Sequence, residues 1–213
     1  MKRRSLEIRG VGGRVVPNAF TEGADDADHL AVIFPGWAYS CERPLLYYTR
    51  VAALEQGADV LTVDYGYNVL ESFDRLSPAD QHVWFERETA AALAAGLAQK
   101  DYARLTLIGK SIGSQAVGRL LGENTAAGGI LLTPTLQVAA LRDQVSAASN
   151  RLLVVLGTGD DAHQPEFLDA LGDDVTRFII EGADHALEIP GDAAASLNVL
   201  ATVTASIAEF LAA

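Results

Sequence analysis

Six short apolar runs, most of them followed by a loop and an amphipathic segment, constrain the fold of this chain more than any other feature. They span residues 29–34, 58–63, 104–108, 129–132, 151–156 and 176–180, and glycine or proline bounds most of them. Runs of this length are typical of strands that are covered on both faces. Because strands that alternate with helices form a mostly parallel sheet with helices on both sides, the sequence predicts an α/β fold, a three-layer α/β/α sandwich.

The whole chain, residues 1–213, is predicted to form one domain. A length of 213 residues and a hydrophobic content of 49% suit a single domain with a large core. Residues 29–213 would form that core. Residues 1–28 would supply one or two edge strands and a polar connecting loop, since their apolar residues come in short stretches that glycine and proline interrupt.

Two long helices are expected among the strands and after them. Ser77 and Pro78 suit an N-cap followed by proline at the first helical position. The face of this helix that would pack on the sheet carries Val83, Ala90, Leu93 and Leu97. The face that would lie in water carries Glu86, Arg87 and Glu88. A final helix from about residue 192 would pack through Leu197, Leu200, Ile207 and Leu211.

Composition predicts a protein that binds neither nucleic acid nor membranes. The formal net charge is −12, so phosphate backbones and anionic membrane surfaces would repel the chain. No stretch is expected to reach the ~18 apolar residues of a membrane helix. Cys41 is the only cysteine, so no disulfide can form within the chain. We therefore expect a cytoplasmic protein, either a monomer or a homodimer, that acts on a small molecule.

A serine in a glycine-rich turn follows the third apolar run. The segment reads Gly109-Lys110-Ser111-Ile112-Gly113, a G-x-S-x-G pattern between a predicted strand and a predicted helix. Such a turn strains the backbone at the serine, which requires small residues two positions before and after it. A tight turn without chemistry would show the same pattern. A phosphate-binding P-loop is excluded, because that motif needs glycine where Arg104 stands.

Two further loops supply the partners that a nucleophilic serine needs. An imidazole must take the proton of the serine, and a carboxylate must orient the imidazole. Asp160 follows the fifth run and His185 follows the sixth. Since the ends of parallel strands meet at one edge of a sheet, Ser111, Asp160 and His185 are predicted to converge. Asp161 and His163 are the rival acid and base, and both are interpreted as loop residues.

From about residue 29 onward, the sequence resembles the α/β-hydrolase superfamily. The resemblance rests on the G-x-S-x-G pattern, on G-x-x-D ending at Asp160 and on G-x-x-H ending at His185. It implies an oxyanion hole formed by backbone N–H groups of Trp37 or Ala38 and of Ile112. Compact members without a separate lid domain, such as dienelactone-hydrolase-like proteins, look most similar, because only residues 133–150 separate the fourth run from the fifth.

Other residues with chemical potential receive simpler interpretations. Tyr39 and Tyr65 follow the first and second runs and are assigned to the substrate pocket. Lys110 is expected to be solvated or salt-bridged, and Cys41 to be a small buried side chain. Residues 157–162 also fit the dinucleotide fingerprint G-x-G-x-x-A, which is kept only as an alternative. Its two aspartates would face a pyrophosphate, and too little chain follows to complete a nucleotide-binding sheet.

Together these residues predict a serine hydrolase that cleaves a small ester, thioester or related acyl substrate. Ser111 would be acylated, with His185 as base and Asp160 as the acid that orients it, and water would then release the product. No metal or organic cofactor is implied, since the four histidines form no metal-binding pattern. Two alternatives stay open. One is a catalytically silent ligand- or partner-binding protein of the same fold, and the other is a related reaction such as perhydrolysis or C–C bond cleavage.

Overall fold

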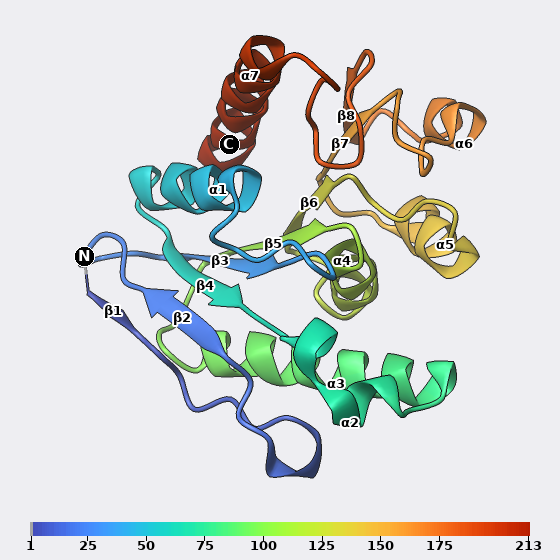
Figure 1. The fold of residues 1–213 in the computed structure, drawn as a ribbon. Helices are drawn as coiled ribbons and strands as arrows, with labels where there is room; N and C mark the ends of the chain where they lie inside the picture. Colours follow the sequence, from blue (N-terminus) through green and yellow to red (C-terminus); the bar gives the residue numbers. More distant parts are fainter. Residues whose placement is uncertain (1) are drawn as a thin grey trace.

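A computed structural model describes residues 2–213, which form an eight-stranded sheet between two layers of helices (Figure 1). The strands are β1 (Arg3–Arg4), β2 (Asn18–Thr21), β3 (His29–Phe34), β4 (Asp59–Val63), β5 (Arg104–Lys110), β6 (Gly128–Leu132), β7 (Leu152–Gly157) and β8 (Val175–Ile180). Their order in the sheet is β1-β2-β4-β3-β5-β6-β7-β8. Strands β3 to β8 run parallel, and β1 and β2 form an antiparallel edge.

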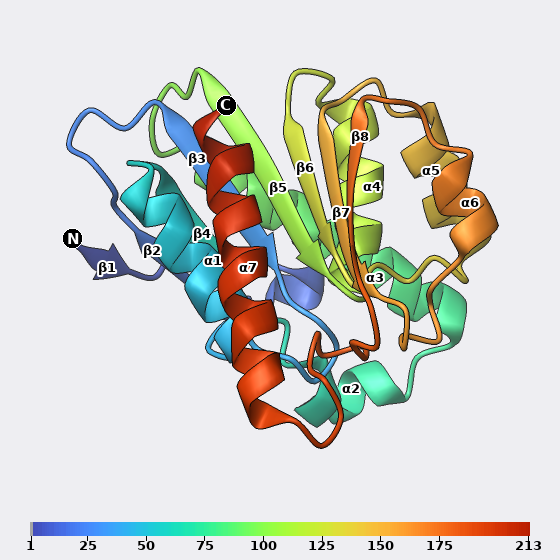
Figure 2. The same ribbon diagram turned by 90° about the horizontal axis from the view of Figure 1, so that it is seen from above.

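Helices cover both faces of this sheet. In the described part of the chain they are α1 (Pro44–Glu55), α2 (Glu71–Asp74), α3 (Pro78–Leu97), α4 (Gly113–Glu123), α5 (Ala139–Ala147), α6 (Pro165–Asp169) and α7 (Ala193–Ala212), with 3₁₀ turns η1 (Val11–Gly13) and η2 (Tyr67–Val69). Helices α1 and α7 pack on one face, and α3 and α4 pack on the other with α5 beside α4 (Figures 1 and 2). The predicted three-layer sandwich is confirmed.

The core strands lie where the apolar runs predicted them, within two residues at each end. Strands β3, β4 and β7 are buried at every position, as expected for strands that are covered on both faces. Residues 1–28 supply β1 and β2, which extend the sheet beyond β4. Between β6 and β7 the described part of the chain carries only the short helix α5 and no inserted lid domain.

Helix α3 begins where the sequence predicted but turns a different face to the core. Ser77 Oγ accepts the N–H of Asp80 at 3.2 Å and caps the helix. Val83 and Leu97, expected in the core, are 44% and 38% exposed. The buried face carries Phe85, Glu88, Thr89, Ala92, Leu93 and Gly96. The prediction that Glu88 faces water was therefore wrong.

The partners of Glu88 explain this difference. Arg14 donates to both carboxylate oxygens at 3.0 and 2.8 Å, and Tyr67 and Trp84 donate to them at 2.8 and 2.7 Å. A buried charge is tolerated when it is paired and hydrogen-bonded in this way. Because Arg14 lies 74 residues earlier in the chain, the pattern within the helix could not reveal it. The same arginine donates to the carbonyl oxygen of Tyr65 and so ties the N-terminal segment to the core.

The final helix, α7, packs against α1 (Figure 2). Asp192 caps it by accepting the N–H of Ala195 at 2.9 Å. Its buried residues are Val203, Ile207, Phe210 and Leu211. The expected packing of Leu197 was wrong. This side chain lies in the second turn from the N-terminal end of the helix and is 66% exposed. The expectation that no stretch would be long and apolar enough for a membrane helix was wrong, because residues 193–212 reach that length with a mean hydropathy of 1.5.

Candidate active site

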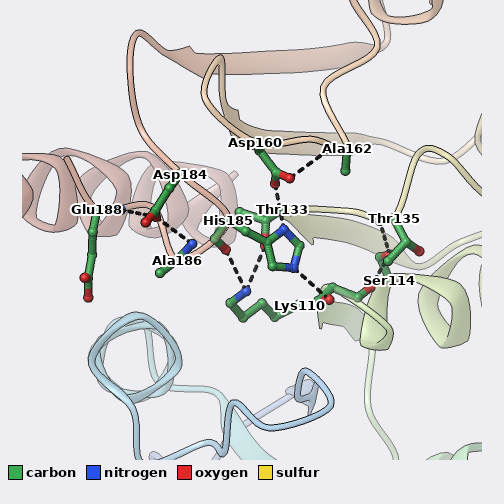
Figure 3. A network of polar contacts seen from close by, with 11 residues as sticks. Lys110, Ser114, Thr133, Thr135, Asp160, Ala162, Asp184, His185, Ala186 and Glu188 are labelled. Carbon is green, nitrogen blue, oxygen red and sulfur yellow. Dashed lines mark hydrogen bonds and ion pairs between the residues drawn. The ribbon is translucent and has the colours of Figure 1, made fainter. Parts of the chain in front are cut away.

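Three loops at the carboxyl ends of β5, β7 and β8 bring a serine, a carboxylate and an imidazole into contact. His185 Nε2 lies 2.9 Å from Ser111 Oγ, and His185 Nδ1 lies 2.8 Å from Asp160 Oδ2. Figure 3 shows one ring nitrogen of His185 turned toward Asp160. The other ring nitrogen is the one that contacts Ser111. The three side chains that the sequence singled out thus meet in the geometry that a base-assisted nucleophile requires.

The turn between β5 and α4 holds Ser111 in a strained backbone conformation. Its φ of 52° lies in the left-handed region, which non-glycine residues rarely adopt. A Cβ on Gly109 would lie 2.3 Å from the carbonyl oxygen of Gly113, and a Cβ on Gly113 would lie 2.1 Å from that of Phe34. Close contacts with backbone atoms therefore require glycine at both positions. Such contacts are the physical reason for the G-x-S-x-G pattern in turns of this kind.

The carboxylate of Asp160 is fixed by two hydrogen bonds. Its side chain is 2% exposed, Oδ1 accepts the N–H of Ala162 at 2.9 Å, and Oδ2 faces the imidazole. Burial alone would raise the pKa of this carboxyl, but the hydrogen bonds from His185 and Ala162, with the charges of His185 and Lys110, outweigh burial and hold the pKa below its usual value. The ionised carboxylate selects the tautomer with a proton on Nδ1, which leaves Nε2 able to accept the proton of Ser111.

The rival acid and base lie outside this contact. Asp161 is exposed, whereas Asp160 beside it is buried. His163 donates its backbone N–H to the carbonyl oxygen of Asp160 at 2.9 Å, which closes the turn that carries the acid. Both positions agree with the interpretation of Asp161 and His163 as loop residues.

The loop after β3 passes close to the nucleophile. A Cβ on Gly36 would lie 3.5 Å from the Cβ of Ser111. Trp37 and Ala38 follow Gly36 directly, and Ile112 follows Ser111 as the N-cap residue of α4. The segments that carry the three expected oxyanion donors therefore flank the same serine from two sides.

The two tyrosines assigned to the substrate pocket occupy different environments. Tyr39 is partly exposed, its hydroxyl accepts the N–H of Leu45 at 3.2 Å, and its ring packs on Lys110. Tyr65 is 2% exposed and stacks on Tyr67, with their ring centroids 5.0 Å apart. Both residues line a cavity of about 230 Å³ beside the loop after β3. The ring of Tyr65 is packed in the core, whereas the ring of Tyr39 is partly exposed, and their assignment to a substrate pocket stays a prediction.

Lys110 was expected to be solvated or salt-bridged, and that expectation was wrong. The residue is 1% exposed. Its Nζ donates to Thr133 Oγ1 at 3.0 Å and to the carbonyl oxygen of His185 at 2.9 Å (Figure 3). Nζ also lies 4.7 Å from the centroid of the Tyr39 ring. These neutral partners come from three other segments of the chain, so no local pattern announced them. Cys41, in contrast, is buried as expected.

Asp184, which no sequence pattern singled out, shapes the turn that carries His185. Its Oδ1 accepts the N–H groups of Ala186 and Glu188 at 2.8 and 3.0 Å (Figure 3). Aspartate commonly stabilises turns through such side chain–backbone bonds. The aspartate directly before the histidine was therefore a usable signal for a fixed turn at this point.

The imidazole lies open to solvent, because the side chain of His185 is 46% exposed. An apolar cavity of about 310 Å³ lies nearby, between α1, α7 and the loop after β8. Its walls include Tyr39, Leu187 and Leu200, but neither Ser111 nor His185 lines it. The other cavity, of about 230 Å³, is lined by Gly36, Trp37 and Ala38 of the loop that passes the serine.

Comparisons with known proteins agree with this architecture. The family model described as alpha/beta hydrolase domain matches residues 39–212. No curated protein matches the sequence. A protein from Butyrivibrio proteoclasticus, solved with ferulic acid bound, is 16% identical with a TM-score of 0.74 over 95% of this chain and 96% of that chain.

Two other solved structures are similar to the same extent. A lid-less α/β serine hydrolase from Xanthomonas campestris is 16% identical, with a TM-score of 0.73 over 98% of this chain and 93% of that one. An esterase from Pyrococcus furiosus is 13% identical, with a TM-score of 0.71 over 99% and 91%. At such identities the likeness concerns the fold alone. The family match, however, spans the chain from the loop after β3 to the last helix, and the chain belongs to the α/β-hydrolase domain family.

Proposed function

We propose that this protein is a serine hydrolase that cleaves small ester, thioester or related acyl substrates. The observation that carries the proposal is the contact of one imidazole, that of His185, with Ser111 Oγ at 2.9 Å and with Asp160 Oδ2 at 2.8 Å. A serine hydroxyl is a weak nucleophile until a neighbouring base accepts its proton. Two proteins of the same fold support the proposal: the P. furiosus protein is described as an esterase, and the X. campestris protein as a serine hydrolase without a lid.

In the proposed acylation step, Ser111 Oγ attacks the carbonyl carbon while His185 Nε2 accepts the hydroxyl proton. The carbonyl π electrons move to oxygen, and backbone N–H groups of Trp37 or Ala38 and of Ile112 are the proposed donors to this oxyanion. One such donor is worth about 3 kcal/mol of barrier. The imidazolium then protonates the leaving oxygen or sulfur as its bond to carbon breaks, which leaves an acyl-serine.

Water completes the cycle through the same groups. His185, neutral again, accepts a proton from a water molecule whose oxygen attacks the acyl carbon. The imidazolium returns that proton to Ser111 Oγ as the acid leaves, and Asp160 stabilises the imidazolium in both halves of the reaction. The exposure of His185, 46% of its side chain, gives water direct access to the base.

The open site favours small substrates. A lid-less surface supplies few contacts to a long acyl chain, because a large apolar ligand gains affinity mainly by being enclosed. The net charge of −12 also favours neutral or cationic substrates over anionic ones. We therefore propose short acyl groups on a neutral or cationic leaving group as the substrate class.

Hydrolysis of p-nitrophenyl esters of increasing acyl length, with matching thioesters, tests this proposal. We expect the wild-type protein to hydrolyse them and to prefer the shortest acyl groups. Ser111→Ala should lose the activity, because it removes the nucleophile, and Ser146→Ala on the exposed surface of α5 should keep it. A wild-type protein that hydrolyses none of these substrates would overturn the proposal and favour the silent binding protein. So would a Ser111→Ala variant as active as the wild type.

A further inference from the structure

A buried ammonium group connects the strand that carries the serine to the loop that carries the imidazole. Lys110 is the last residue of β5 and directly precedes Ser111. Its Nζ donates to the carbonyl oxygen of His185 at 2.9 Å and to Thr133 Oγ1 at 3.0 Å (Figure 3). The ring of Tyr39, 4.7 Å away at its centroid, adds a cation–π contact. Three groups from three other segments therefore hold one ammonium.

Thr133, one of these three groups, is held in place at the carboxyl edge of the sheet. Thr133 directly follows β6, is fully buried, and donates its N–H to the carbonyl oxygen of Val155 at 2.7 Å. His185, in contrast, belongs to a loop, and Asp160 holds its ring through Nδ1. The two contacts with His185 are complementary, because Asp160 sets the orientation of the ring and Lys110 sets the position of the backbone that bears it.

We propose that Lys110 is a positioning residue for the base: its ammonium fixes the backbone of His185 against the ends of β5 and β6, so that Nε2 stays within reach of Ser111 Oγ. This inference rests on the function proposed above. Burial of an ammonium without a carboxylate partner costs stability, which an apolar side chain of similar length would avoid. The proposed role explains why a charged group occupies this position.

The charges around Lys110 set the pH range in which it can act. The titratable groups that face it are Tyr39 from the loop after β3, Asp160 from the loop after β7, and Asp184 and His185 from the loop after β8. Burial lowers the pKa of Lys110 to about 8, although the charges of Asp160 and Asp184 oppose the shift. Burial raises the pKa of Tyr39, so that ring stays neutral while the lysine titrates.

The lowered pKa of Lys110 determines how its hold on the His185 loop changes with pH. Below pH 8 the amine is protonated and holds the carbonyl oxygen of His185 as an ammonium. Above pH 8 it loses its charge and one donor, so its hold on the loop weakens. The wild-type kcat is therefore expected to fall as the pH rises through about 8.

Kinetics of Lys110→Met on both sides of pH 8 test the proposal. We expect kcat to fall by about 10- to 100-fold with little change in KM, because a slightly misplaced base affects the chemical step more than substrate binding. The alkaline decline through pH 8 should disappear in this variant. Thr133→Val removes one acceptor at constant shape and should lower kcat in the same direction by less. Lys2→Met, the same change at an exposed lysine, should match the wild type.

A readout that does not depend on turnover separates this proposal from the hydrolase proposal. The Nδ1 proton of His185, followed by NMR in the substrate-free protein, should give a sharp signal in the wild type and a broadened one in Lys110→Met. If the wild type hydrolyses esters but Lys110→Met keeps its kcat, its alkaline decline and its Nδ1 signal, the positioning role is wrong and the hydrolase proposal stands. If the wild type is inactive, an unchanged Nδ1 signal still overturns the positioning role.

A folding failure of Lys110→Met would leave two tests in place. The wild-type pH profile needs no variant, and Thr133→Val retains the lysine. A wild-type kcat that stays constant through pH 8, together with an unchanged Nδ1 signal in Thr133→Val, would overturn the positioning role.

Discussion

Replacing His185 with alanine is expected to lower kcat/KM for a short p-nitrophenyl ester by about 10⁴-fold or more. The variant keeps the serine on its elbow and the carboxylate of Asp160 in place, but no group remains to accept the proton of Ser111 Oγ. Steady-state kinetics of the purified variant measure the loss. Asp160 would be left buried without its imidazole partner, so a thermal melt must show that the variant is folded.

His163→Ala is the matched control for this prediction. His163 lies on the acid loop, where only its backbone N–H contacts Asp160. We expect this variant to keep the wild-type kcat/KM, since the substitution leaves that backbone bond intact. A large loss in His163→Ala with a small one in His185→Ala would show that the base had been assigned to the wrong loop.

The second large effect is expected on stability, at the glycine that follows the nucleophile by two positions. A Cβ on Gly113 would lie 2.1 Å from the carbonyl oxygen of Phe34 and 2.9 Å from that of Pro35. These contacts are with backbone atoms of a central strand and its loop, which cannot move aside cheaply. Gly113→Ala should therefore lower the free energy of unfolding by about 4 kcal/mol and Tm by about 10 °C. Denaturant and thermal unfolding of the purified variant measure both.

Gly122 provides a control on the same helix. Both glycines lie in α4, but a Cβ on Gly122 would meet no atom within 4 Å. Gly122→Ala should raise the free energy of unfolding by about 0.5–1 kcal/mol, because alanine is the better helix former. Equal destabilisation by the two substitutions would mean that the cost arises from the helix as a whole and not from the contact with β3.

The strands, and the contact of Ser111 and Asp160 with His185, could be predicted because short sequence patterns indicate them directly. A strand that is covered on both faces must be apolar at nearly every position, so β3 and β7 appear as continuous runs. Gly109 is required by a contact within its own turn, and Gly113 by a contact with the end of β3, but the turn pattern itself marks both positions. Asp160 and His185 lie in the loops that follow β7 and β8, and parallel strands bring such loops to one edge.

What the sequence could not reveal depends on partners that are far apart in the chain. Glu88 looks like a surface residue of α3, but Arg14 and Tyr67, which lie 74 and 21 residues earlier in the chain, donate hydrogen bonds to it in the interior. Lys110 looks like a surface lysine, but Thr133 and the carbonyl oxygen of His185 accept hydrogen bonds from its buried ammonium group. In each case one charged side chain lies in the interior because distant groups satisfy it, and hydrophobic periodicity carries no information on such pairs.

Labelling with a fluorophosphonate, followed by peptide mapping, tests most directly whether the imidazole of His185 activates the hydroxyl of Ser111. This reagent forms a stable adduct with a serine whose proton a neighbouring base removes. We expect one adduct per wild-type chain, located on Ser111, and no adduct in Ser111→Ala or His185→Ala. An adduct on any other residue, or labelling of Ser111→Ala at the wild-type rate, would contradict this activation.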